Sequence, residues 1–117
     1  MEKTITISGQ AVKLKATAAV PRLYRIKFRR DIIQDITALE KVVKKKKTDG
    51  GDLPPEALEM FENVAYIMAR HADPEGVPNT PEEWLDKFDT FSIYQVLPEI
   101  LELWQLNMET GSTSKKK

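Results

Sequence analysis

The chain has 117 residues, the length of one ordinary domain, and its 41% hydrophobic and 31% charged residues are typical of a globular protein with a highly charged surface. It contains no cysteine and one histidine, His71, which excludes disulfides, cysteine-bound zinc and thiolate catalysis and leaves almost nothing for a Ser-His-Asp triad. No apolar run is long enough to cross a bilayer, and the N-terminus lacks the apolar core of a secretory signal. We therefore expect a cytoplasmic protein that is not bound to a membrane.

The net charge of zero conceals two oppositely charged halves. Residues 1–47 carry 13 Lys and Arg against 4 Asp and Glu, whereas residues 48–111 carry 2 against 14, and three lysines end the chain. Such halves attract each other within one chain or between neighbouring copies. The pattern favours docking or self-association over simple nucleic-acid binding.

The first predicted element is a β-hairpin over residues 3–16. Polar and apolar side chains alternate on both sides of the turn signal Ser8-Gly9-Gln10, which indicates strands with one apolar face. A lone hairpin is marginally stable in water, so this face must pack on helices or extend another sheet.

Two helices are predicted next, over about 18–28 and 32–45, with Thr17 and Asp31 as their N-caps. The second has a clean apolar stripe at helical spacing, formed by Ile32, Ile36, Leu39 and Val43. A glycine-containing flexible loop is expected over 48–52.

The acidic half predicts three more helices. The first runs over about 54–71, the second is short and is capped by Thr80, and the last covers about 91–108. The last helix is apolar on most of its sides, so it is expected to lie at the centre of the core or to be covered by a partner. Pro98 is expected to kink or break it.

These elements predict an α+β fold, mainly helical, with an N-terminal β-hairpin followed by about five helices. We expect one domain over 1–110 and a disordered, lysine-rich tail over 111–117.

Residues that could carry chemistry have simpler explanations. His71 lies near two acidic loop residues, but a metal site needs more ligands, and a histidine stabilised by the dipole at a helix C-terminus explains it. Glu56, Glu59 and Glu62 could hold Mg²⁺ or transfer protons, but they lie opposite an apolar stripe, as a solvated acidic face would. We therefore expect no catalytic residue, no metal and no cofactor.

Two sets of residues are binding candidates. The basic segment Arg22–Arg30 is interleaved with aromatic residues and could bind nucleic acid, or it could be a solvated face that complements the acidic half. Aromatic residues also crowd the last third of the chain, and such residues are enriched in binding hot spots. Ordinary core accounts for most of these, with one or two left to line a partner groove; the candidates are Trp84, Phe88, Phe91, Tyr94 and Trp104.

The sequence resembles the tail assembly chaperones of long-tailed phages and prophages of Gram-positive bacteria. The resemblance covers about residues 1–108 and is carried by the segments TAAVPRLYRIKF (17–28), DIIQD (31–35), LEMFENVAYIMARHA (58–72), TPEEWLDKF (80–88) and FSIYQVLPEIL (91–101). It is a likeness of the whole layout, because none of these segments is a chemical signature.

The resemblance implies a non-enzymatic helper in the cytoplasm of the bacterial host that is absent from the mature virion. Such chaperones coat the hydrophobic, helical tape measure protein, keep it soluble and bring tail tube subunits to it. The family also implies two forms, because a ribosomal frameshift adds an extension that recruits the tube protein. Codons for Lys115–Lys117 could form an adenine-rich slippery site, although a solubilising tail or a cloning remnant would look the same.

We therefore expect helix-in-groove capture of tape measure segments by apolar surface on the last two helices, with several copies for each client. The alternative is a small nucleic-acid-binding regulator that uses Arg22–Arg30, and the acidic second half counts against it. An enzyme is the weakest reading, because the chain lacks cysteine and has one histidine.

Overall fold

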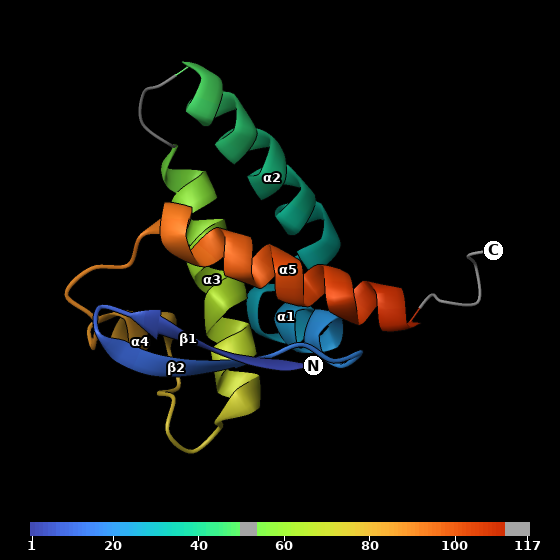
Figure 1. Cartoon of the computed structure of the whole chain (residues 1–117). Coiled ribbons are helices and arrows are strands. Elements are labelled where there is room, and N and C mark those ends of the chain that lie inside the picture. Colours follow the sequence, from blue (N-terminus) through green and yellow to red (C-terminus); the bar gives the residue numbers. More distant parts are fainter. Residues whose placement is uncertain (50–53, 112–117) are drawn as a thin grey trace.

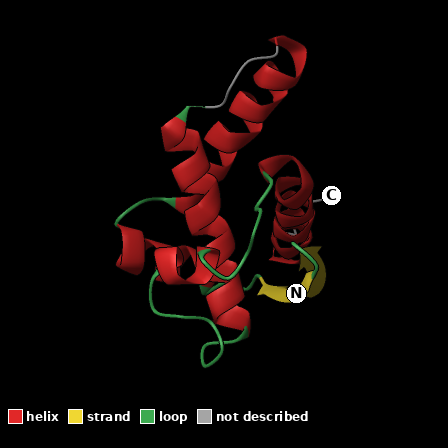
Figure 2. Cartoon of the chain, turned by 90° about the vertical axis from the view of Figure 1, so that its left-hand side faces the viewer, coloured by secondary structure: helices red, strands yellow, loops and turns green. Residues whose placement is uncertain are grey.

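The computed structural model describes residues 1–49 and 54–111 and confirms the α+β, mainly helical architecture (Figures 1 and 2). The described elements are β1 (Glu2–Ile7), β2 (Gln10–Lys15), α1 (Val20–Phe28), α2 (Ile32–Asp49), α3 (Pro55–Ala72), α4 (Pro81–Leu85) and α5 (Ile93–Gly111). The predictions of a flexible loop at 50–52 and of a disordered tail at 112–117 lie outside the described residues.

The hairpin forms as predicted, as an antiparallel pair of β1 and β2. Ser8 and Gly9 form its two-residue turn with φ of 53° and 81°, and two successive positive φ angles match the type I′ turn that suits the twist of a hairpin. The side chains of one face are buried, and these are Ile5, Ile7, Val12 and Leu14. This face packs on α3 and α5, which gives the hairpin the apolar support that it needs in water.

Helix α3, rather than the last helix, lies at the centre of the molecule. It contacts β2 and all four other helices, and every residue from Val64 to Ala69 is buried (Figure 1). Ala57, Ala65 and Ala69 are among its buried residues, and small side chains leave room for larger neighbours to interdigitate. The sequence analysis allowed the last helix to be the central one, but in the structure the central helix is α3.

Helix α5 crosses α3 and is tied to the hairpin. Lys3 on β1 forms ion pairs with Glu99 and Glu102 on α5. The helix runs through Pro98 without a break, contrary to one of the two predicted outcomes. Proline removes a single backbone donor in the helix interior, and here the acceptor that loses its i+4 partner is the carbonyl of Tyr94.

Two of the three predicted N-caps are confirmed. The backbone N–H of Ile33 donates to the Asp31 carboxylate at 2.9 Å, and that of Glu83 donates to Oγ1 of Thr80 at 3.2 Å. The prediction for Thr17 is wrong, because α1 begins at Val20 with Ala19 as its N-cap residue. Thr17 is too far upstream, and its hydroxyl accepts from the N–H of Ala19 at 3.2 Å.

Helix ends differ from the predicted bounds by a few residues. Helix α2 continues to Asp49, so Thr48 and Asp49 are helical rather than part of a loop. The lysines at 44–47 are good helix formers, and nothing before Gly50 stops the helix. Helix α5 likewise includes Gly111, which had been predicted in the tail.

No helix within residues 1–49 and 54–111 is both long enough and apolar enough to cross a membrane.

Candidate functional site

Most of the predicted partner-binding aromatic residues belong to the core. Trp84 is 2% exposed and Trp104 is 6% exposed, while Phe88 and Phe91 are half-buried. The ring of Trp84 meets those of Phe88 and Phe91 edge-on, at centroid distances of 5.3 and 5.4 Å, and Phe91 stacks on Phe61 at 4.9 Å. Such pairs are typical of a packed core. Neither tryptophan is available as surface to a partner of the free chain, which corrects the prediction for these two residues.

Tyr94 is the exception among the five, because half of its surface (50%) is exposed. It lies in the first turn of α5, beside a groove of about 230 Å³ between α2 and α5. The residues that line this groove are Glu40, Val43 and Lys44 of α2 and Ile93, Tyr94, Leu97, Pro98 and Leu101 of α5. We call it the α2–α5 groove.

The lining of the α2–α5 groove is largely apolar. Its two charged residues, Glu40 and Lys44, both come from α2, and the side contributed by α5 is formed by aliphatic, aromatic and proline side chains. On α5, the exposed Tyr94 and Pro98 and the partly buried Leu101 follow each other at i, i+4 and i+7, so they lie on one face of the helix, whereas Leu97 is 1% exposed and belongs to the core. An apolar groove between helices is suited to an apolar helix face rather than to a polar small molecule.

Sequence reasoning found α5 but missed the contribution of α2. Val43 was assigned to the core stripe of α2, and it is only partly buried, as is its neighbour Val42. The one signal for this site in the sequence was the excess of apolar positions on α5, and the apolar stripe of α2 indicated core alone.

The basic segment divides into engaged and unengaged side chains. Arg30 pairs with Asp35, and Nζ of Lys27 donates to the carbonyl of Asn79 at 2.6 Å. Arg22, Arg25 and Arg29 are exposed and form no ion pair or side-chain hydrogen bond with any residue that the structure describes. Beside them Ile26 is 62% exposed.

A buried polar network fixes the junction of α1 and α2. The hydroxyl of Tyr24 donates to Oδ2 of Asp35 at 2.6 Å, and Arg30 donates to the same carboxylate through Nε and Nη2 at 2.7 and 2.8 Å. Burial alone would raise the pKa of Asp35, but the hydrogen bonds from Arg30 and Tyr24 hold that pKa below its usual value. Burial and the Asp35 carboxylate raise the pKa of Tyr24, so it stays a hydrogen-bond donor. The network positions α1 and is structural.

His71 lies in the last turn of α3, as predicted, but its surroundings disfavour the charged form that the helix dipole would stabilise. Nε2 of His71 lies 2.8 Å from Oγ1 of Thr17, and burial, together with the charge of Lys15, lowers the pKa of the imidazole. A lowered pKa keeps the ring neutral at pH 7, as a link between α3 and the segment before α1.

The glutamates of α3 lie on a solvated face. Glu56 and Glu59 are exposed and Glu62 is half-buried. Burial raises the pKa of Glu62, as do the nearby charges of Glu59 and Glu82. Within the described residues, no three His, Asp or Glu side chains are grouped so that they could hold a metal ion.

The chain was compared with protein-family models, with curated proteins and with solved structures, and none of them matches it.

Proposed function

We propose that this protein is a non-enzymatic tail assembly chaperone that binds helical segments of a phage tape measure protein in the α2–α5 groove. It would keep its client soluble in the host cytoplasm and help to recruit tail tube subunits through a frameshifted longer form. The observation that carries the proposal is the apolar groove beside half-exposed Tyr94. The resemblance of the segments at 17–28, 58–72 and 91–101 to this class of chaperones supplies the identity of the client.

The proposed binding mode is an amphipathic helix of the client lying along α5. Anchor side chains at i, i+3 or i+4, and i+7 would meet the row of Tyr94, Pro98 and Leu101. Covering the exposed half of Tyr94, roughly 100 Å², would contribute about 2.5 kcal/mol at ~25 cal/mol per Å². One groove thus gives modest affinity, so a long client would be covered by several copies.

The test is co-expression of the full chain with a fragment of the tape measure protein. Wild-type protein should raise the soluble yield of the fragment, and Tyr94→Asp should abolish this effect, because a charge placed in an apolar contact must be desolvated. Ile26→Asp is the matched control, since it adds the same charge at an exposed apolar position outside the groove. Circular dichroism checks that both variants are folded.

Two outcomes would contradict the proposal. If folded Tyr94→Asp solubilises the client as well as wild type does, the α2–α5 groove is not the binding surface. If wild-type protein has no effect on the fragment, the chaperone function itself is wrong.

A second candidate function is nucleic-acid binding through the basic segment, and the observation that favours it is the unengaged set of Arg22, Arg25 and Arg29. Phosphate contacts would make the affinity fall steeply with salt. A salt-dependent mobility shift with DNA or RNA that is lost in a triple alanine variant of these arginines would support this function over the chaperone.

A further inference from the structure

The outer edge of β2 carries unpaired backbone groups. Met1 and Ala16 exchange both of their backbone hydrogen bonds, at 3.0 and 2.8 Å, so the ladder alternates from this pair along the hairpin. The pairs Glu2–Lys15, Thr4–Lys13 and Thr6–Ala11 are therefore the non-hydrogen-bonded ones. The N–H and C=O groups of Ala11 and Lys13 point away from β1 and meet no hydrogen-bonding partner among the described residues.

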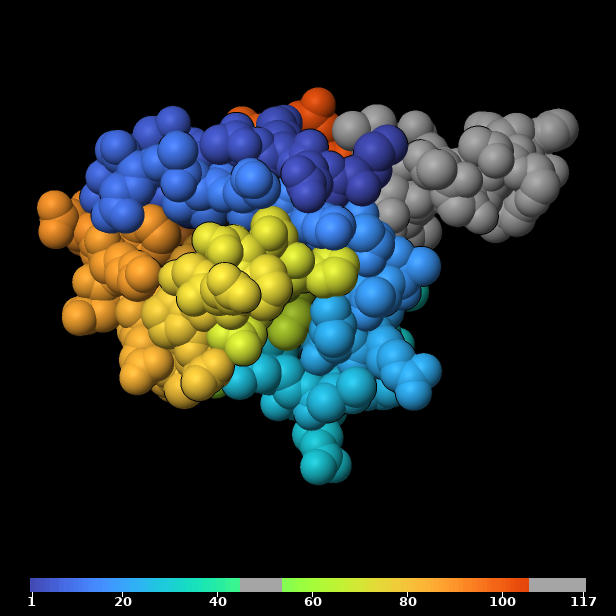
Figure 3. All heavy atoms as spheres, turned by 90° about the horizontal axis from the view of Figure 1, so that it is seen from below, coloured from blue at the N-terminus to red at the C-terminus, as the bar shows by residue number. Residues whose placement is uncertain are grey.

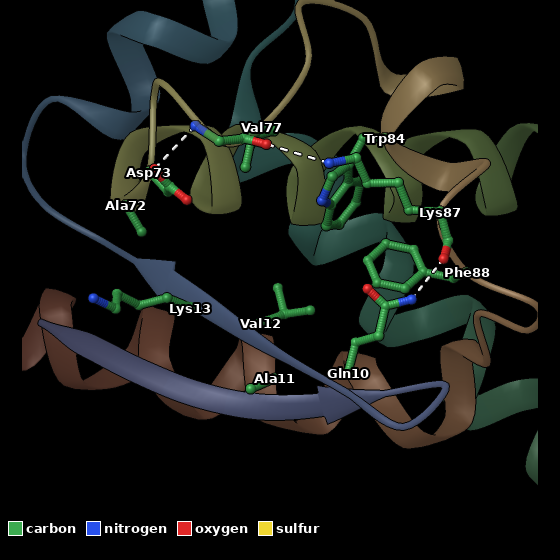
Figure 4. A pocket seen from close by; sticks show the side chains of 11 residues that line it. Gln10, Ala11, Val12, Lys13, Ala72, Asp73, Val77, Trp84, Lys87 and Phe88 are labelled. Atoms are coloured by element: carbon green, nitrogen blue, oxygen red, sulfur yellow. Dashed lines mark hydrogen bonds between the residues drawn. The ribbon is translucent and has the colours of Figure 1, made fainter.

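A groove of about 430 Å³ runs beside this edge (Figure 4). One side is β2 from Gln10 to Lys13, and the other is the segment from the end of α3 to α4, including Val77, Trp84 and Phe88. Figure 3 shows the hairpin bordering this segment on one face of the molecule. Gln10 bridges the groove at the turn end, where its Nε2 donates to the carbonyl of Lys87 at 2.6 Å.

The charges at the edge favour an acidic occupant. Lys13 lies on the solvent face of β2, and Lys15 follows it on the same face. Lys87 lines the opposite side. Asp73 is the one acidic residue of the lining, and its Oδ1 already accepts from the N–H of Gly76 at 3.0 Å.

We propose that the outer edge of β2 binds an extended, acidic segment of another protein as a third strand of the sheet. The added strand would form backbone hydrogen bonds with Ala11 and Lys13, which is the β-augmentation mode of peptide recognition. In an antiparallel pairing, its acidic side chains lie opposite Lys13 and Lys15, because directly paired residues share one face of a sheet. Its alternate, apolar side chains face the groove at Val77 and Phe88.

The other edge of the hairpin provides an internal contrast. Among the described residues the outer edge of β1 also has no third strand, but the wall that faces it across the neighbouring cavity is formed by the polar residues Thr90, Gln95 and Glu99, whereas Val77 and Phe88 face the edge of β2. The groove at β2 shares no residue with the α2–α5 groove, so the two sites are tested separately.

The probe is a synthetic hexapeptide, acetyl-Glu-Val-Glu-Leu-Glu-Val-amide, titrated into the full chain and followed by two-dimensional NMR. Binding with a dissociation constant below about 1 mM, the weak end of specific recognition, should shift the amide resonances of Ala11 and Lys13. A peptide with Lys in place of Glu should bind at least tenfold more weakly.

Backbone methylation separates strand addition from simple charge attraction. In the proposed pairing the amides of the Glu residues face β2, so N-methylation of these amides should abolish binding. N-methylation of the Val and Leu amides, which face away, should change the affinity less than threefold. Equal effects of the two patterns would overturn the proposal.

Proline substitution tests the edge from the protein side. Ala11→Pro removes one outward donor without a ladder bond to β1, and Thr6→Pro makes the same change in its cross-strand partner on the opposite edge. Ala11→Pro should weaken peptide binding at least tenfold, and Thr6→Pro should leave peptide binding unchanged.

The proposal fails if the Ala11→Pro variant binds the peptide normally or if the wild-type protein shows no binding at 1 mM peptide. Should Ala11→Pro unfold, the methylated peptides on wild type decide the matter. If the free wild-type chain dimerises and Ala11→Pro abolishes the dimer, the edge binds a second copy of the chain, and the acidic-segment proposal is overturned.

Discussion

Replacing Tyr24 with phenylalanine isolates one hydrogen bond of the buried network between α1 and α2. The change removes the hydroxyl that donates to Oδ2 of Asp35 at 2.6 Å and leaves the ring in place. Arg30 still donates two hydrogen bonds to the same carboxylate. A hydrogen bond to a charged group contributes about 1.5–3 kcal/mol, so Tyr24→Phe should lower the free energy of unfolding by about 2 kcal/mol at pH 7.

The loss should depend on pH in a defined direction. The folded-state pKa of Asp35 lies below its usual value, so its stabilising contribution is present above the unfolded-state pKa of about 3.9 and is lost as the pH falls through the folded-state pKa. Once Asp35 is protonated, the hydroxyl of Tyr24 bonds to a neutral group, and neutral hydrogen bonds are about half as strong. The cost of Tyr24→Phe should then shrink to about 1 kcal/mol.

Urea unfolding followed by circular dichroism, at pH 7 and at acidic pH, measures both quantities. Tyr94→Phe is the matched control, because the hydroxyl of this exposed tyrosine has no hydrogen-bond partner among the described residues; its effect should stay within about 0.5 kcal/mol. The reasoning is refuted if Tyr24→Phe is as stable as wild type at pH 7, or if its cost grows as the pH falls.

Three further predictions concern the core, the charges and the gene. Trp84→Ala should destabilise the fold by about 3–5 kcal/mol in urea unfolding, because Trp84 is buried among the three aromatic rings of Tyr66, Phe88 and Phe91; a cost below 1 kcal/mol would remove it from the core. If basic and acidic halves meet between copies, sedimentation should show association weakening from about 0.05 to 0.5 M salt, whereas one mass throughout would exclude an electrostatic interface. The codons of Lys115–Lys117 should contain an adenine-rich slippery heptamer followed by an open −1 frame, and an immediate stop in that frame would rule out the frameshifted form.

The hairpin and most helices could be predicted because their signals are local. Alternation around Ser8-Gly9 specifies a hairpin, and the side chains of Asp31 and Thr80 cap the helices that follow them because each lies directly before an amphipathic segment. Helix ends were less certain, since α2 continues through lysines that favour helix as far as Asp49.

Which helix lies at the centre of the core could not be predicted from the sequence. The periodicity of apolar residues shows how many sides of a helix are apolar, but it does not show which helix the others pack around. Helix α5 has more apolar residues than one core face needs, and α3 instead is buried all round from Val64 to Ala69. The network of Tyr24, Arg30 and Asp35 could not be predicted from the sequence for a related reason. A carboxylate on an amphipathic helix looks solvated in sequence, and only the fold brings two donors to it.

The α2–α5 groove contains one residue that the sequence predicted and one that it did not. Tyr94 was predicted among five aromatic residues, but sequence could not separate it from Trp84 and Trp104, since exposure depends on what packs against each side chain. Val43, on the other wall of the groove, comes from a helix some fifty residues earlier in the chain and gave no functional signal of its own.

Site-specific photocrosslinking tests the proposed chaperone function most directly. A benzophenone amino acid in place of Tyr94, irradiated with a purified helical fragment of the tape measure protein, should form a crosslinked product, and the same probe in place of Ile26 should form none. Crosslinking at Ile26 and not at Tyr94 would move the client to the basic face, and the absence of any product at both positions would contradict the capture of tape measure segments by this surface.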